Sequence, residues 1–97
     1  SMTELNAKST INRNSDAAFR IVDGKALIVM PREAMLYTLN PVGSWIWNNL
    51  DGNTVEEVAN AMTVEFDVEF ERALQDTLRF LNEISEKGML EITESAK

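Results

Sequence analysis

Carboxylates are the abundant side chains here that could act as acid, base or metal ligand, because the sequence contains no histidine and no cysteine. Ser/His and Cys/His catalysis, thiolate metal sites and disulfides are therefore excluded. Carboxylates alone could still perform general acid–base chemistry. The sixteen Asp and Glu residues are spread at helix-surface spacing, which favours a solvated face. With no glycine-rich phosphate loop either, the residue types favour a binding protein without enzymatic activity, cofactor or metal.

The charge is divided unevenly along the chain. Residues 1–50 hold five basic and four acidic side chains, whereas residues 51–97 hold four basic and twelve acidic ones. Nucleic-acid binding draws most of its affinity from basic side chains that contact phosphates. The acidic half of the chain predicts no nucleic-acid partner.

Ninety-seven residues suit one small domain with a modest core. Ser1 precedes Met2, so we expect Ser1 to be a cloning remnant. The polar, non-periodic residues 1–17 predict a flexible tail, residues 18–93 the domain, and residues 94–97 a short C-terminal tail. There is no run of about 18 apolar residues, so we expect no membrane partner. The lack of cysteine fits a reducing cytoplasm.

Three strands are predicted in the first half of the domain, at residues 18–23, 26–30 and 34–39. Asp23-Gly24 is a strong hairpin turn signal between the first two. The unbroken apolar run 26–30 predicts a strand buried on both faces. Alternation along the third strand puts Met35, Tyr37 and Leu39 on one face, and Leu36 and Thr38 on the other.

Three helices are predicted next, at about 41–50, 55–66 and 69–87, and a short strand is expected near residues 89–93. Capping residues mark the helix ends. Asn40-Pro41 starts the first helix and Asp51-Gly52 ends it. Thr54 with Glu57 caps the second helix, Asp67 can cap the third, and Gly88 ends the third. The fold class expected is therefore α+β, with a three-stranded antiparallel sheet followed by three helices.

Apolar residues of the third helix cover a wider arc than a single core-facing stripe requires. Leu74, Leu78 and Leu81 can serve the core, whereas Thr77, Phe80 and Ile84 lie toward one flank and could face a groove. The alternative is that all of them belong to the core. In the first helix, Trp45 is expected in the core and Trp47 partly exposed.

Three short strands before three helices form a winged-helix arrangement with its sheet placed first. At residues 18–93 the chain resembles the PqqD family of recognition elements for ribosomally made precursor peptides, named for pyrroloquinoline quinone (PQQ) synthesis. The motifs that carry the resemblance are Phe19-Arg20, Leu36-Tyr37-Thr38-Leu39-Asn40, Ile46-Trp47, the run from Leu50-Asp51-Gly52 to Val58, Phe80-Leu81 and Gly88-Met89-Leu90.

This resemblance implies a peptide chaperone whose third strand takes up a precursor's leader as an added strand, in a groove against the third helix. It implies these roles: Leu36, Tyr37, Thr38 and Leu39 pair with the leader backbone; Thr77, Phe80, Leu81 and Ile84 shape apolar pockets; Asp76, Arg79 and Glu83 meet charged leader groups. The partners implied are the precursor peptide and a modifying enzyme, in some systems a radical-SAM protein. An iron–sulfur cluster would belong to that enzyme, because this chain has no cysteine.

Two other functions stay open at this point. A winged-helix regulator of DNA would use the helix–turn–helix, although its second and third helices carry nine acids between Glu56 and Glu86. A structural module would pair its exposed strand edge with that of a second copy, giving a homodimer.

Overall fold

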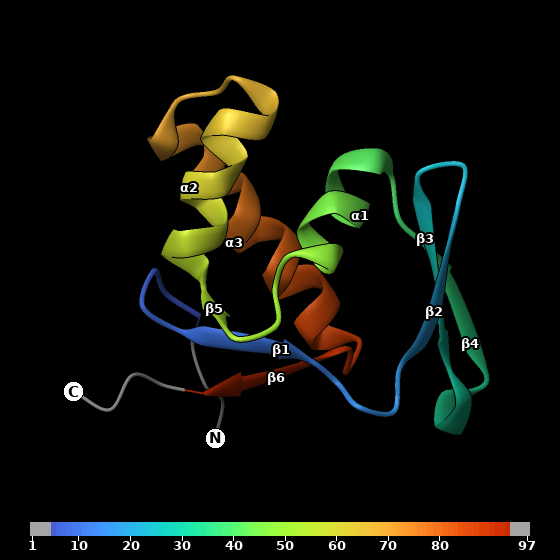
Figure 1. The fold of residues 1–97 in the computed structure, drawn as a ribbon. Helices are drawn as coiled ribbons and strands as arrows, with labels where there is room; N and C mark the ends of the chain where they lie inside the picture. The colour runs from blue at the N-terminus through green and yellow to red at the C-terminus, as the bar shows by residue number, and fades with distance from the viewer. Residues whose placement is uncertain (1–4, 94–97) are drawn as a thin grey trace.

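Two three-stranded antiparallel sheets and three α-helices make up residues 5–93, the part of the chain described by this computed structural model (Figure 1). One sheet has the order β5-β1-β6, formed by Asn53–Thr54, Thr10–Arg13 and Leu90–Thr93. The other has the order β2-β3-β4, formed by Ala18–Val22, Lys25–Met30 and Met35–Thr38. The helices are α1 (Pro41–Asn48), α2 (Val55–Phe66) and α3 (Phe70–Glu86). The predicted α+β class is confirmed, with a second sheet that was not expected.

The β2-β3-β4 sheet follows from local turn chemistry. Asp23 and Gly24 have φ values of 54° and 78°, the left-handed pair that a two-residue hairpin turn requires. The short 3₁₀ helix η1 (Pro31–Glu33) makes the second turn. The prediction that the β3 run is buried on both faces is wrong, because Ala26, Ile28 and Met30 are buried while Val29 is 40% exposed. Among the described residues, α1 packs against one face of this sheet, and no helix covers the opposite face (Figure 1).

Side-chain caps set the starts of two helices, as predicted. Asn40 Oδ1 accepts a hydrogen bond from the Gly43 amide at 2.8 Å, and Pro41 occupies the first turn of α1. Thr54 and Glu57 form a reciprocal capping box at the start of α2. Asp67 was expected to cap α3, and this is wrong. Asp67 instead ends α2 in a left-handed conformation with φ of 55°, and Glu69 precedes α3 without a side-chain cap.

The N-terminal segment is partly structured, so the prediction of a flexible tail through residue 17 is wrong for β1. Thr10–Arg13 pair with β5 on one side and β6 on the other. Ile11 is fully buried in the core and Ser9 nearly so. The predicted C-terminal tail, residues 94–97, lies outside the described residues. The expected terminal strand is confirmed as β6.

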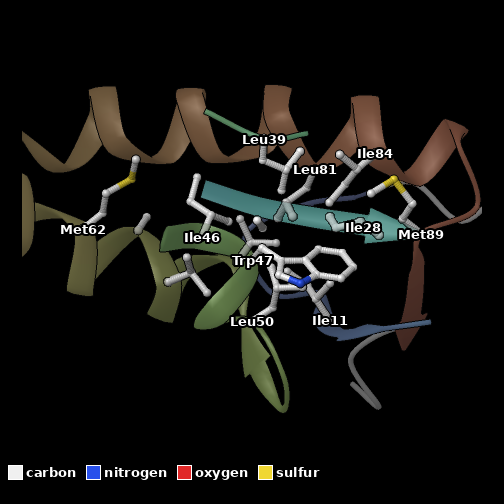
Figure 2. Close-up of a cluster of buried hydrophobic side chains, with 14 of the residues drawn as sticks. Ile11, Ile28, Leu39, Ile46, Trp47, Leu50, Met62, Leu81, Ile84 and Met89 are labelled. Atoms are coloured by element: carbon white, nitrogen blue, oxygen red, sulfur yellow. The ribbon is translucent and has the colours of Figure 1, made fainter. Parts of the chain in front are cut away.

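The core gathers side chains from both sheets and all three helices around Trp47 (Figure 2). Trp47 is fully buried, and its ring meets that of Phe19 edge-on at 5.6 Å between centroids. Trp45 is only half-buried and packs edge-on against Phe66. The predicted assignment of the two tryptophans is therefore reversed. The β2-β3-β4 sheet covers the face of α1 that carries Trp47, and helical periodicity alone does not show that a sheet packs there.

Candidate functional site

Strand β4 offers a free edge, because within residues 5–93 it pairs with β3 alone. Leu39 lies opposite Ala26 on β3, and its amide donates a hydrogen bond to the Ala26 carbonyl at 2.9 Å. Leu39 and Ala26 therefore form a hydrogen-bonded pair of the ladder. Hydrogen-bonded and non-bonded pairs alternate along an antiparallel ladder. The register pairs Ile28 with Tyr37 and therefore directs the backbone groups of Leu36 and Thr38 away from β3, to the free edge.

The two faces of β4 have different surroundings. Leu39 is buried and Tyr37 half-buried on the face toward the helices, whereas the Leu36 side chain on the opposite face is 63% exposed. The ammonium of Lys87, directly after α3, lies 5.8 Å from the Tyr37 ring centroid. This contact places the C-terminal end of α3 beside β4.

A pocket of about 230 Å³ lies where the start of α1 meets the exposed flank of α3. Its apolar part is formed by Val42, Gly43, Ile46 and Phe80. The polar rim consists of Asn40, Asp76, Arg79 and Glu83. Asn40 follows β4 after a single residue, which places one side of the pocket close to the C-terminal end of β4.

Charges on the rim are partly neutralised within α3. Asp76 accepts a hydrogen bond from Arg72 Nε at 3.2 Å and a short one from Arg79. These two arginines lie one turn before and one turn after Asp76, at spacings that bring helix side chains together. Glu83 makes no ion pair within the described residues.

Four of the seven predicted α3 residues line this pocket: Asp76, Arg79, Phe80 and Glu83. The other three, Thr77, Leu81 and Ile84, lie in the core and line no surface pocket. The core position of Leu81 agrees with the helical spacing, whereas Thr77 and Ile84 were expected to face a groove. Figure 2 shows Leu81 and Ile84 on the inner side of α3, close to Leu39 and Ile28. Thr77 is satisfied there by a hydrogen bond to Met62 Sδ at 3.4 Å. Whether the four pocket-lining residues bind a peptide remains a prediction.

Four pocket residues were missed, and all come from α1 or its cap: Asn40, Val42, Gly43 and Ile46. The glycine at position 43 is a sequence feature that could have indicated this α1 side of the pocket. Glycine inside a helix is unfavourable and usually has a packing reason. Here a Cβ on Gly43 would lie 2.8 Å from Cε1 of Phe80, so the bare backbone makes room for the ring.

A second hollow of about 340 Å³ lies on the β2-β3-β4 sheet. It is lined by Ala18, Phe19, Arg20, Leu27, Val29 and Leu36. No residue of α3 contributes to it, so it is a separate surface from the pocket between α1 and α3.

The described residues include no group of three or more carboxylates that could hold a metal ion. No helix among them is long and apolar enough to cross a membrane. What the site offers is a free strand edge and, near its end, a pocket with apolar walls and a charged rim, features of domains that bind an extended chain.

The family model for coenzyme PQQ synthesis protein D (PqqD) matches residues 25–90. The chain belongs to the PqqD family. No curated protein sequence matches the chain with significance.

Solved structures with the same fold include TbiB1 in complex with the TbiA(beta) leader peptide. It is 25% identical, with a TM-score of 0.77, over 81% of this chain and 93% of TbiB1. A lasso peptide synthetase B1 complexed with its leader peptide is 23% identical, with a TM-score of 0.75, over 84% of this chain and 96% of that one. The PqqD truncation of Methylobacterium extorquens PqqCD is a stand-alone recognition element for ribosomally synthesized and post-translationally modified peptides (RiPPs). It is 19% identical, with a TM-score of 0.76, over 90% of this chain and 94% of that one.

Proposed function

We propose that this protein binds the leader of a ribosomally made precursor peptide by strand addition to the free edge of β4 and presents it to a modifying enzyme. The observation that carries the proposal is the unpaired edge at Leu36 and Thr38, with the pocket between α1 and α3 lined by Asn40, two residues further along the chain. A free edge supplies main-chain affinity for any extended segment, and an adjoining pocket supplies selectivity among side chains.

The relatives support the peptide half of this proposal. TbiB1 and the lasso peptide synthetase B1 were both solved with leader peptides, and the Methylobacterium domain is a recognition element. The family match gives the chain the same class of protein, so a leader peptide is the ligand we assign to its groove.

Presentation to an enzyme is the second half. An added strand would extend the sheet sideways and leave its outer face, with exposed Val29 and Leu36, open to a partner. The proposed role needs no catalytic group in this chain, and the chemistry belongs to the enzyme, a radical-SAM protein in some systems. We place the complex in the cytoplasm, where ribosomes make the precursor.

Isothermal calorimetry tests the proposal, with synthetic leaders of the precursor genes that neighbour this one as titrants. We expect one-to-one saturable binding for one of them, and none for a peptide of the same composition in scrambled order. Sedimentation in parallel reports on self-association through the same edge. Mass that rises with protein concentration, together with no leader binding, would replace the proposal by a homodimer.

A further inference from the structure

The rim of the pocket carries one carboxylate without an ion-pair partner within residues 5–93. Asp76 and Glu83 are the two carboxylates that line it, and Asp76 is engaged by Arg72 and Arg79. Glu83 has no ion-pair partner within residues 5–93, although Lys87 follows it by four residues. The Lys87 ammonium lies instead over the Tyr37 ring. Glu83 is therefore the rim carboxylate that is free to pair with a basic group of a ligand, and the Asp76–Arg72–Arg79 triad leaves one net positive charge beside it.

The depth of the pocket depends on Gly43. A Cβ at this position would lie 2.8 Å from Cε1 and 3.2 Å from Cζ of Phe80, closer than side chains normally pack. The ring of Phe80 can lie against α1 only because Gly43 has no side chain. A methyl group there would force the ring to shift and would itself occupy part of the pocket wall.

The size of the pocket indicates what fills it. A volume of about 230 Å³ is below the roughly 300–1,000 Å³ typical of sites for drug-sized molecules and suits a single side chain. Side chains two positions apart on an extended segment share a face and stand about 7 Å apart. When an apolar side chain of an extended ligand occupies the pocket, the side chain two positions away therefore lies near the pocket rim.

Resting on the proposed function, we propose that the pocket selects leader segments in which an apolar residue is accompanied, two positions away, by lysine or arginine. The apolar side chain contacts Ile46 and Phe80 over Gly43, and the basic group pairs with Glu83. This assigns recognition of the basic group to Glu83 and not to Asp76, because Asp76 is already engaged by Arg72 and Arg79.

A charge-swap cycle tests the assignment, with the leader that binds in calorimetry and its single-residue variants as probes. Replacing the leader's basic residue by glutamate should weaken binding to the wild-type protein about fivefold, because an exposed ion pair is replaced by repulsion between two carboxylates. In the Glu83→Lys protein, the affinity for that leader variant should return to within about twofold of the affinity between the wild-type protein and the unchanged leader. Glu86→Lys is the matched control, because it changes net charge equally at an exposed position of α3 outside the pocket, and it should not restore binding.

The apolar half is tested with Gly43→Ala, whose helical backbone accepts alanine. Replacing the leader's apolar residue by alanine should cost about tenfold in the wild-type protein and less than twofold in this variant, with its folding checked by circular dichroism. If amide signals of Leu36 and Thr38 shift on binding while both cycles show no coupling, the pocket assignment is overturned and strand addition stands. If no leader binds, both proposals are overturned.

Discussion

At the scale of single residues, Arg13 joins the β2-β3-β4 sheet to the helices. Its amide and guanidinium donate to the two carboxylate oxygens of Asp51 at 2.7 and 2.8 Å, and Nη1 donates to the Trp47 carbonyl at 3.2 Å. The guanidinium also lies 4.6 Å from the ring centroid of Phe19 on β2. One side chain thus connects β1, β2 and α1, and it helps to hold the sheet that carries the free edge.

Arg13→Ala should lower the free energy of unfolding by about 1–3 kcal/mol, because it removes two charge-assisted hydrogen bonds and a cation–π contact. Urea unfolding followed by tryptophan fluorescence measures the change. Arg20→Ala is the control, since Arg20 is exposed and makes no ion pair within residues 5–93; it should stay within about 0.5 kcal/mol of wild type. Equal effects of the two substitutions would show that Arg13 does not connect the parts.

Residue-level predictions from the sequence were right where the deciding contact is local. The caps at Asn40 and Thr54 follow from neighbours three residues away. They were wrong for Trp47 and Thr77, because the partners that bury these side chains come from other elements. Phe19 on β2 packs on Trp47, and Met62 on α2 on Thr77. Helical periodicity predicts the direction in which a side chain leaves the helix axis, but it does not predict which other element packs against that side chain.

At the scale of elements, β1 shows the limit of local signals most clearly. Its partners β5 and β6 lie some 40 and 80 residues further along the chain, and β5 has only two residues. No short-range pattern marks such a strand, and the polar residues around Ile11 suggested a tail. The hairpin, α1 and α2 were predictable because their turns and caps are encoded within a few residues. Helix α3 begins without a side-chain cap and was predictable from its apolar spacing alone.

Ile11→Ala should cost about 2–5 kcal/mol of unfolding free energy, the range for truncating a fully buried isoleucine. A flexible tail would give almost no change. Chemical denaturation measures the difference, with Val64→Ala as the control because Val64 is 85% exposed on α2. A stability equal to that of the control would contradict the structural role of β1.

The role of the free edge of β4 can be tested by comparing two substitutions at Leu36. Proline at position 36 removes an amide that makes no ladder bond, so we expect Leu36→Pro to fold, as edge strands accept proline. Calorimetry should show leader affinity reduced at least tenfold, because proline cannot donate to an added strand. Leu36→Ala loses the same side chain but keeps the amide, and should bind within about threefold of wild type. Equal losses in both variants would mean that the side chain, and not the edge, binds the leader.

At the scale of the whole molecule, a groove between the third strand and the third helix was expected, and the pocket that the structure shows lies between α1 and α3. The strand edge and four α3 residues follow from alternation, from helical spacing and from the resemblance to the PqqD family. The α1 wall could not be predicted in this way, because the crossing of α1 over α3 depends on how the two sheets pack around Trp47. The excess of acid in residues 51–97 sets the character of the surface and favours a basic ligand over a phosphate backbone.

Amide hydrogen exchange by NMR, with and without saturating leader peptide, tests the central claim most directly. Strand addition predicts that the Leu36 and Thr38 amides, which make no bond to β3, become at least tenfold slower to exchange when the leader binds. By the same alternation, Phe19 and Ile21 face the other free edge of the sheet, on β2, and their exchange should not change. A bound leader that leaves Leu36 and Thr38 unprotected, or protects Phe19 and Ile21 instead, would contradict the account.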